Sequence, residues 1–530
     1  MVSSMDPRTD SVVPAAAGAA TLPPDAGPDI ASALARRFAA AGVPTRIVRT
    51  HISWVLLAGD RAWKLKRPVR FGFLDFSTPA LRRHACDEEV RLNRRLVPSL
   101  YLGVVPVRAA PDGPSLEGVG EPIDWAVAMR RLPDGAIASE RLAAGTLEPS
   151  HLAALARRLA VFHRAAPVAP PDSPYGRPAG IRDDALRALD ALAPLADAAT
   201  CARLRGRLEA LSVALAPRWE TRLRAGRVRE GHGDLHLDNV LVEDDGVTAF
   251  DCIEFDASLR WIDTASDLAF PIADLLARGR EDLAWGFLDD CLQADGDVDG
   301  LDVLRFYVAY RAVVRALVGA LRERDGTASG GPTPARWLEV ALQATDTPSP
   351  RLAITHGLPG SGKSVVARAL LERTGAVRLR SDVERKRMAG LGALDDSSTA
   401  GDLYGAQAGR ATYARLVALA GVALRAGWPT IVDAACLRRP QRDAFRALAA
   451  SLGVPFAILD CDAPLPLLHR RVAARRARGD DPSEADGPVL ERLAASREPL
   501  AADERVSAID VRTDGPLDLD GLAARWKAIR

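Results

Sequence analysis

The sequence predicts a two-domain protein of mixed α/β and α+β class, with a bilobal first domain and a second domain in which helices flank a parallel sheet. Three observations support this prediction. A His-Gly-Asp loop precedes an expected β-hairpin at residues 232–251, and a glycine-rich loop joins a strand to a helix at residues 352–364. Between them, residues 326–350 are rich in Gly, Pro, Ser and Thr, which break regular structure. We expect domains at 29–325 and 351–530, joined by this linker.

The loop at 232–239 has the pattern H-x-D-L-x-x-x-N, which is the spacing of a kinase-type catalytic loop. In such a loop an Asp takes or orients the proton of an acceptor hydroxyl, and an Asn holds a metal ion on the nucleotide phosphates. Asp234 and Asn239 occupy these positions. The alternative is a plain loop that contains a hydrogen-bonded His.

The residues after this loop favour the kinase-type interpretation. Strands at 240–243 and 247–250, joined by a tight turn at Asp245-Gly246, predict a hairpin. Asp251 follows the hairpin, where a second metal-binding carboxylate belongs.

With HGDLHLDN followed by FDCIEFD, the region resembles the aminoglycoside phosphotransferase branch of the kinase-like fold. Its loop carries Gly and a second His where protein kinases have Arg and a variable residue. The resemblance implies a nucleotide-clamping small lobe at about 29–132 and a helical lobe at about 133–325. It also implies ATP and Mg²⁺ as cofactors and a hydroxyl group as phosphate acceptor.

The composition of the chain indicates what kind of protein carries this chemistry and which partners it would have. The chain has 530 residues with 48% hydrophobic and 26% charged content, as in ordinary globular proteins. A net charge of +1 gives no field that draws the whole chain to nucleic acid or membrane. The six cysteines show no metal-binding spacing, and no apolar run reaches the roughly 18 residues of a membrane span. Residues 1–28 lack the features of a signal peptide and predict a disordered tail. We therefore expect a soluble cytoplasmic protein, whose oligomeric state the sequence does not define.

The predicted small lobe contains a candidate phosphate-gripping lysine. Lys64 lies in an A-x-K pattern on the second of two short strands and resembles the strand lysine of kinases. Lys66 is the near alternative, and both are otherwise solvated lysines at a sheet edge. In the helix expected at 79–96, Glu89 is preferred over Glu88 as the partner of that lysine because it lies on the apolar side.

Two further parts of the small lobe face the nucleotide in this interpretation. No G-x-G-x-x-G precedes the strands, so a short turn at Thr50–Ser53 would cover the phosphates. The apolar strand at 125–132 leads into a hinge, where backbone groups near Met129 would meet adenine.

The helical lobe offers several polar residues with two possible roles each. We expect His163 to be structural and Asp267 to brace the catalytic loop. The acidic segment at 281–302 fits either a rim for a cationic aminosugar or a solvated helix end. Tyr307, Arg311 and Arg315 are spaced four apart, so they would share a helix face, contacting an anionic substrate or loop carboxylates. If they line the pocket, they argue against an aminoglycoside.

The second domain opens with a P-loop. Residues 352–356 predict a strand, and GLPGSGKS at 357–364 matches G-x-x-x-x-G-K-S. Its backbone N–H groups wrap phosphates, Lys363 reaches the β- and γ-phosphates, and the Ser364 hydroxyl binds Mg²⁺. The remaining phosphate-binding residues are Gly357, Gly360, Ser361 and Gly362.

Later strand ends supply acids and arginines. Asp382 and Arg385 follow a strand at 376–380 in an S-D-x-x-R pattern, which is similar to that of small P-loop kinases. That similarity implies a base and an arginine that steadies substrate; a helix N-cap is the alternative role of Asp382. Asp433 ends an apolar strand and is the candidate Mg²⁺ carboxylate. In the expected lid helix, Arg471, Arg475 and Arg478 share one face, from which one arginine, with Arg475 as the candidate, would contact phosphate; the alternative is a solvated basic face.

From about residue 30 to its end, the chain resembles bacterial proteins that fuse an aminoglycoside-phosphotransferase-like domain to a P-loop kinase of the AAA-family-ATPase type. The resemblance implies a bifunctional ATP-dependent phosphotransferase, with each site phosphorylating a hydroxyl of a small molecule. Two alternatives stay open. One domain would bind or hydrolyse nucleotide to regulate the other, or the P-loop domain would phosphorylate nucleic-acid ends, against which the near-neutral charge argues.

Overall fold

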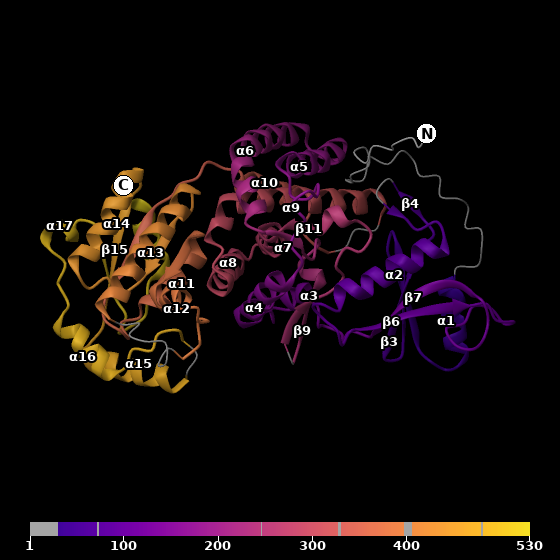
Figure 1. The fold of residues 1–530 in the computed structure, drawn as a ribbon, viewed down its shortest axis with the longest axis horizontal. Helices are drawn as coiled ribbons and strands as arrows, with labels where there is room; N and C mark the ends of the chain where they lie inside the picture. The colour runs from indigo at the N-terminus through magenta and orange to yellow at the C-terminus, as the bar shows by residue number, and fades with distance from the viewer. Residues whose placement is uncertain are drawn as a thin grey trace. The chain divides into compact units, whose positions relative to one another are not determined.

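The computed structural model describes residues 30–71, 74–244, 246–326, 330–396, 405–478 and 481–529. The expected tail at 1–28, Asp245 of the hairpin turn and residues 327–329 of the linker lie outside these ranges. The chain divides into two compact units, one ending at Arg278 and resuming at Phe306–Thr345, the other made of Gly279–Arg305 and Asp346–Arg530. The labels in Figure 1 follow the order of the elements along the chain. In the part of the chain described, no helix combines the length and apolar character that crossing a membrane requires.

The first unit begins with a five-stranded antiparallel sheet in the order β1-β2-β3-β7-β6. Helix α1 covers one face, where Leu34 packs with Trp54 and Leu65. Helix α2 belongs to the other core, where Val90 packs with Tyr101. Thr78 caps α2 by accepting from the Leu81 N–H, and Pro79 follows at the first helical position. The bounds are α1 Ile30–Ala40, β1 Thr45–Arg49, β2 Ser53–Ala58, β3 Arg61–Lys66, β4 Arg70–Phe71, β5 Leu74–Asp75, α2 Pro79–Asn93, β6 Tyr101–Arg108 and β7 Pro122–Arg130.

The rest of the first unit is mainly helical. Helix α7 is apolar on nearly all sides and is correspondingly buried along almost its whole length. The hairpin of β9 and β10 forms as expected, with Val242 opposite Val247. The bounds are α3 Ala138–Ala143, α4 Pro149–Ala165, α5 Pro178–Leu192, α6 Ala198–Arg224, β8 Val228–Glu230, β9 Val240–Glu243, β10 Gly246–Ala249, β11 Trp261–Asp263, α7 Thr264–Ala277, α9 Leu301–Arg324 and α10 Pro334–Ala344.

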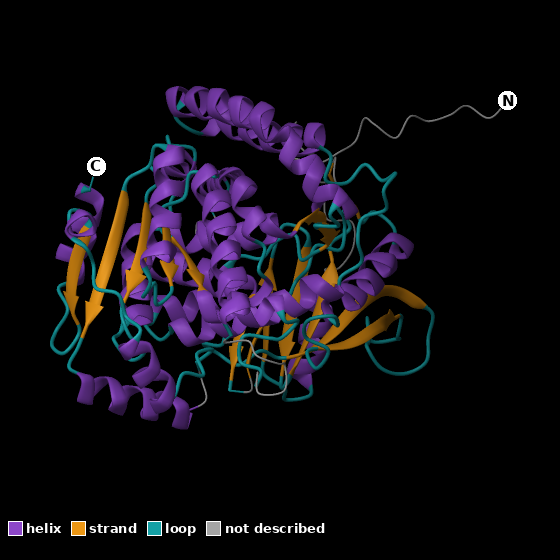
Figure 2. Ribbon diagram, turned by 60° about the vertical axis from the view of Figure 1, so that its left-hand side comes forward, coloured by secondary structure: helices purple, strands orange, loops and turns teal. Residues whose placement is uncertain are grey.

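The second unit is built on a parallel sheet in the order β13-β14-β12-β15-β16, whose strands run side by side in Figure 2. The central strand β12 is fully buried, as its continuous apolar run predicts for a sheet covered on both faces. Its core joins Val366 of α11 to Trp526 of α18. The bounds are α8 Glu281–Asp295, β12 Leu352–His356, α11 Lys363–Thr374, β13 Val377–Arg380, α12 Ser381–Met388, α13 Ala406–Arg425, β14 Thr430–Asp433, α14 Arg439–Leu452, β15 Phe456–Asp462, α15 Leu465–Arg478, α16 Gly487–Ala495, α17 Ala502–Arg505, β16 Ala508–Arg512 and α18 Leu519–Ala528.

The predicted class, a kinase-like domain followed by a P-loop domain with a helix-flanked parallel sheet, is confirmed. Residues 279–305 nevertheless pack with the second unit, although their sequence precedes the expected linker. Trp285 packs against the second unit's core and lies edge-on to Trp428, with ring centroids 6.1 Å apart. The Trp428 indole N–H donates to the Leu301 carbonyl at 3.1 Å. A cut between residues 345 and 346 would therefore separate the second unit from α8.

Asp289 of α8 is neither part of an aminosugar rim nor a solvated helix end. Its side chain is 1% exposed and accepts from Arg378 at 2.6 Å and from Arg368 at 2.8 Å. Asp290 also pairs with Arg368. Burial alone would raise the pKa of Asp289, but Arg378 and Arg368 hold it below its usual range. The acidic segment thus carries a buried ion cluster of the second unit.

Asp289→Asn is expected to destabilise the second unit. Removing one partner of a buried ion pair costs about 3–5 kcal/mol because the remaining charge is left unpaired. Urea denaturation of the full chain, followed by tryptophan fluorescence, would show the transition of this unit at lower urea. Asp299→Asn, at an exposed residue nearby, is the matched control and should stay within about 0.5 kcal/mol of the parent. Equal midpoints for the two variants would contradict the role given to Asp289.

Candidate active sites

The first site centres on a lysine held between two carboxylates. Lys64 of β3 donates to Glu89 of α2 at 2.8 Å and to Asp251, beyond β10, at 2.5 Å. The structure thus brings together three residues that the sequence assigns to the nucleotide. Burial would lower the pKa of Lys64, but Asp251 and Glu89 raise it well above the usual value. Glu88, the alternative to Glu89, pairs instead with Arg91 and Arg260.

Lys66 has a second, separate role. It is fully buried and donates to Glu89 at 2.5 Å and to Glu254 in a very short contact. Alternation along β3 puts Lys64 and Lys66 on one face of the sheet. Glu89 therefore bridges both lysines, and Lys66 ties α2 to the segment that carries Asp251.

The catalytic loop places its acid and amide side by side. The Asn239 amide nitrogen donates to the Asp234 carbonyl at 2.9 Å and lies 3.4 Å from the Asp234 carboxylate. His236 Nε2 lies 3.2 Å from that same carboxylate. Burial would raise the pKa of Asp234, but His236 and Arg315 hold it below its usual range. Asp234 is thus ionised at neutral pH.

Asp267 braces this loop through its backbone. Its carboxylate accepts from the N–H groups of His232 at 2.8 Å and Gly233 at 2.9 Å, and His163 Nε2 lies 3.1 Å away. Asp274 likewise accepts from the Leu237 N–H at 2.9 Å. Both carboxylates come from α7 and are fully buried. The expected structural roles of His163 and Asp267 agree with these contacts.

Two residues of the first site, Gly233 and Asp251, have positive φ angles, which most residues rarely adopt. Gly233 has φ of 88°, and a Cβ there would lie 2.7 Å from the Leu259 carbonyl oxygen, so only glycine fits without displacement. Asp251 has φ of 64° although it is not glycine. Its N–H donates to the Tyr101 hydroxyl at 3.2 Å. Such conformations cluster at functional sites, because the surrounding contacts over-determine them.

The two segments of the small lobe that were expected to face the nucleotide, the hinge near Met129 and the turn at Thr50–Ser53, have different surroundings. Met129 is buried in β7, between Ala62 of β3 and Tyr101 of β6, so its backbone is enclosed in the sheet. The chain leaves β7 after Arg130, and the expected adenine contact near Met129 stays a prediction. The short turn between β1 and β2 is closed by Ser53, whose N–H donates to the Thr50 hydroxyl at 2.9 Å.

The three residues that were expected to share one face of α9 have different surroundings in the structure. Tyr307 is buried near Trp219, and Arg311 donates to the Ser266 hydroxyl at 2.9 Å. Arg315 instead lines a cavity of about 470 Å³ together with Arg278, Arg322 and Asp238. Its guanidinium lies 3.6 Å from the Asp238 carboxylate. Tyr307 and Arg311 are therefore core residues, whereas Arg315 faces the space beside the catalytic loop.

The second site follows β12. The P-loop is tight at Gly360, where φ is 83° and a Cβ would lie 2.8 Å from the Leu468 carbonyl oxygen. Lys363 donates to the Leu358 carbonyl at 2.8 Å and lines one cavity with Ser364 and Asp433. Burial lowers the pKa of Lys363, and the Asp433 carboxylate opposes that shift.

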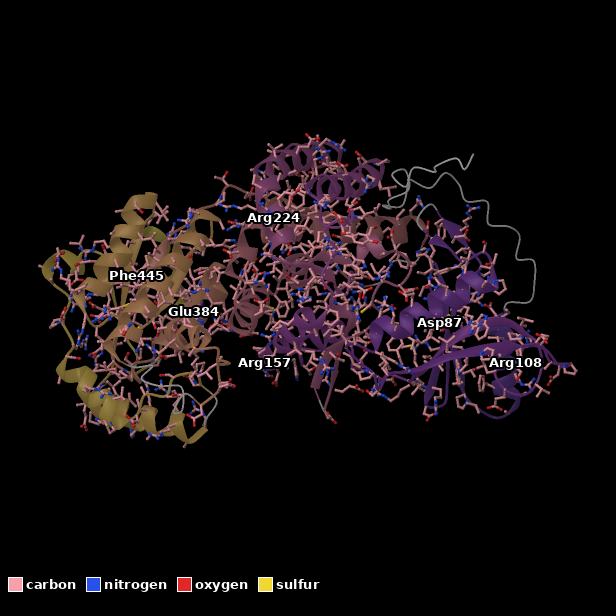
Figure 3. The ribbon with its side chains drawn as sticks, viewed as in Figure 1. Asp87, Arg108, Arg157, Arg224, Glu384 and Phe445 are labelled. Atoms are coloured by element: carbon pink, nitrogen blue, oxygen red, sulfur yellow. The ribbon has the colours of Figure 1, made fainter. Side chains whose placement is uncertain are left out.

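Two acids stand at neighbouring strand ends, as expected in an open parallel sheet. Asp433 ends β14, and Asp382 opens α12 just after β13. Arg385 donates to Asp382 at 2.7 Å. Burial would raise the pKa of Asp382, but Arg385 and Arg380 hold it below its usual range. Glu384 on the same helix, labelled in Figure 3, pairs with Arg387 and Arg415 and is structural.

The arginines of α15, the helix expected to form the lid, contact different parts of the second unit. Arg475 lines the cavity that holds Lys363 and donates to the Ala485 carbonyl at 3.2 Å. Arg471 instead contacts the P-loop and the end of β16, donating to the Gly360 carbonyl at 3.2 Å and to the Thr513 carbonyl at 2.6 Å. Of the lid arginines, Arg475 is the one that faces the cavity with the P-loop lysine.

Several residues that contact the candidate site residues were not predicted from the sequence. His236 was noted only as a departure from the protein-kinase loop, although its side chain contacts Asp234. Glu254 and Asp274 had no motif to mark them, because their partners are distant in sequence. For Glu254 the one available signal was its place three residues after Asp251 in FDCIEFD.

Comparison with known proteins gives the same two parts. The phosphotransferase enzyme family matches residues 56–307, and an AAA domain family matches residues 352–500. Uncharacterized proteins of Mycobacterium tuberculosis and Mycobacterium bovis are 33% identical over 453 residues, which cover 84% of this chain and 89% of theirs. An ethanolamine kinase of Plasmodium vivax aligns over 58% of this chain and 83% of its own, with 11% identity and a TM-score of 0.37. The APS kinase of Mycobacterium tuberculosis aligns over 34% of this chain and 96% of its own, with 22% identity and a TM-score of 0.25.

The two folds, each with its lysine and carboxylates, define an ATP-dependent kinase. The chain belongs to the family of these mycobacterial proteins and joins a phosphotransferase-family domain to a P-loop domain of AAA type. Phosphoryl transfer is the general chemistry of both parts.

The two lysines of β3 should respond differently to substitution. Lys66→Met leaves Glu254 buried without its cation, so we expect a loss of about 3–5 kcal/mol in the free energy of unfolding of the first unit. Lys64→Met leaves Glu89 paired to Lys66 and should instead weaken Mg-ATP binding with a smaller stability loss. Urea denaturation and nucleotide titration, both in a Lys363→Ala background, would separate the two. Weak ATP binding with unchanged stability in Lys66→Met would reverse the assigned roles.

Proposed function

We propose that the protein is a bifunctional phosphotransferase, in which each domain transfers the γ-phosphate of ATP to a hydroxyl of its own small-molecule substrate. One observation carries the proposal. Each unit separately holds a half-buried lysine near one carboxylate, which we assign to the metal, and near a second, ionised carboxylate. A nucleotide-binding module without transfer activity needs no such second carboxylate.

The donor groups fit a magnesium ion at both sites. Asp433 Oδ2 is buried and accepts no hydrogen bond from the described part of the chain, and Ser364 lines the same cavity. In the first site the Asn239 amide nitrogen is engaged with Asp234, which leaves the Asn239 amide oxygen as an acceptor. Carboxylate, hydroxyl and amide oxygens are the ligands that Mg²⁺ prefers. When bound, the metal would neutralise charge on the transferred phosphoryl group.

The chain's own residues then divide the work. In the first site Lys64 grips phosphate oxygens, and Asp234 orients the acceptor hydroxyl and accepts its proton. Asp267 keeps the catalytic loop in place through the His232 and Gly233 N–H groups. In the second site Lys363 and Arg475 contact phosphates, Asp382 serves the acceptor, and Arg385 fixes the orientation of Asp382. Positioning of this kind supplies most of the catalysis in phosphoryl transfer.

The acceptor of the first site is unlike an aminoglycoside in this proposal. Arg315 and Arg322 line the cavity beside the catalytic loop, and Arg315 acts on the charge of Asp234. The acidic segment that would have suited an aminosugar belongs to the second unit. Two guanidiniums next to the transfer site would repel a polycation.

The first site is tested by separating its base from its metal ligand. In a Lys363→Ala background, Asp234→Asn should keep Mg-ATP affinity and lower acceptor-dependent turnover about 10²–10⁴-fold, the range of a positioned general base. Asp251→Ala should instead weaken Mg-ATP binding. Nucleotide titration and ADP release measure the two effects. Equal loss of nucleotide binding in both variants would contradict the separate roles.

The second site is tested by acceptor-stimulated ADP release in a Lys64→Met background. Lys363→Ala should abolish activity, because the phosphate-gripping cation is lost. Asp382→Asn should keep ATP binding and slow hydrolysis while losing the response to acceptor. The screen includes polyols, nucleosides and oligonucleotides with a 5′-hydroxyl. If no acceptor stimulates the parent, or Asp382→Asn responds as the parent does, a regulatory nucleotide-binding domain replaces the kinase. Stimulation by oligonucleotides alone would favour a nucleic-acid-end kinase.

A further inference from the structure

The cavity of the second site extends well beyond the P-loop. It has a volume of about 250 Å³, and its lining includes Lys363, Asp433 and Asp382 as well as residues of helices α14 and α16. The residues that line it end at Ser496, so they include no part of β16 or of Thr513, where Arg471 is engaged. The extension therefore leads away from the P-loop on the side of Asp382, where an acceptor must lie.

The charges that line this cavity are unbalanced. Six cationic side chains contribute, against only two carboxylates, Asp382 and Asp433. Four of the six have partners or duties already described. Lys363 and Arg475 serve the phosphates, Arg380 lies near Asp433 and Asp481, and Arg385 pairs with Asp382. The two that are left over are Arg438 and Arg492.

Arg438 and Arg492 line the cavity beside α14 and α16, and both residues are also exposed to solvent. Arg438 immediately precedes α14, and Arg492 lies on α16, so two separate elements each contribute one arginine to the lining of this cavity. Within the described ranges, neither side chain forms an ion pair with a carboxylate. Their neighbours in the lining are the polar Gln441 and Ser496 and the apolar Leu437 and Leu493.

We propose that Arg438 and Arg492 bind an anionic group of the acceptor, a carboxylate or a phosphate, whose reacting hydroxyl lies at Asp382. This inference rests on the proposed kinase activity of the second site and names its substrate class. A planar guanidinium matches both anions in charge and geometry, and two of them can hold one anion from two directions. The small cavity suits a compact hydroxy acid or a phosphorylated polyol.

The chemical step is ordinary phosphoryl transfer. The acceptor hydroxyl oxygen forms a bond to the γ-phosphorus of ATP, the bond from that phosphorus to the β,γ-bridging oxygen breaks, and ADP leaves. The hydroxyl proton passes to the Asp382 carboxylate and then to solvent. The two arginines take no part in bond changes, so they act on binding of the acceptor.

The test uses the full chain with Lys64→Met, which silences the first site. ADP release is measured with three matched probes, namely glucose, gluconate and glucose 6-phosphate, and with a 5′-hydroxyl oligonucleotide. We expect stimulation by the anionic probes and none by glucose; preference between gluconate and the phosphate identifies the anion. Arg438→Gln and Arg492→Gln should each raise the KM for the anionic acceptor about 10–100-fold, as loss of one charged hydrogen bond predicts, with kcat and the KM for ATP little changed. Arg525→Gln, an exposed arginine of α18 outside the cavity, should change none of these constants.

The outcomes distinguish the proposed anionic acceptor from the proposed kinase activity of the second site, on which it rests. Equal stimulation by glucose, or an unchanged KM in both arginine variants, overturns the anionic acceptor while the kinase stands. Stimulation by the oligonucleotide alone overturns the small-molecule class. If no acceptor stimulates, the kinase assignment of the second site fails and this proposal fails with it. A second readout needs no turnover: calorimetric titration of inorganic phosphate into the chain saturated with Mg-ADP should show binding that the double variant Arg438→Gln, Arg492→Gln lacks.

Discussion

A fully buried carboxylate must be matched by cations or N–H donors, and the first site is organised around one such carboxylate, Glu89. Its two oxygens take one lysine each from β3, and those lysines continue to Asp251 and Glu254. One side chain of α2 thereby fixes the sheet, the helix and the segment after β10 at once. Leaving one of the buried members, Lys66, Glu89 or Glu254, unpaired would cost several kcal/mol, so the cluster has little freedom to rearrange. Lys64, the lysine proposed to grip the nucleotide, is held in place by the same constraint that holds the lobe together.

The sequence could predict the parts of the sites that lie within short motifs. Asp234, Asn239 and Asp251 are joined by a loop and a hairpin whose local geometry is read from spacing, and Lys363 and Ser364 belong to a single strand–loop–helix unit. Lys64 and Glu89 were harder, because two candidates of each type stood close together. Burial decided between them: Glu89 is fully buried, whereas Glu88 pairs with arginines.

What the sequence could not predict depends on contacts between distant residues. Strands β1 and β6 were missed, since an edge strand with alternating exposure and a strand interrupted by Gly and Pro give weak local patterns. The acidic run at 281–302 looks like a solvated helix, and only the packing of α8 against Arg368 and Arg378 shows otherwise. The split of Tyr307, Arg311 and Arg315 has a related cause. An α-helix has 3.6 residues per turn, so residues spaced four apart are not exactly aligned along its axis. Over two such steps their side chains reach different neighbours.

The carboxylates proposed to face the acceptor, Asp234 and Asp382, are ionised, and this limits what each would do. His236 and Arg315 hold the pKa of Asp234, and Arg385 and Arg380 hold the pKa of Asp382, below the usual range in spite of burial. A carboxylate with a low pKa is a weak base, so early proton abstraction would gain little from it. Its negative charge can still accept a hydrogen bond from the acceptor hydroxyl and fix the direction of its lone pair. In a loose transition state the hydroxyl becomes acidic only as the new bond to phosphorus forms, and proton transfer can follow then. The side chains that lower these pKa values therefore favour orientation over basicity, and in the second unit Arg385 would hold Asp382 for that proposed task in a cavity whose lining carries more cations than carboxylates.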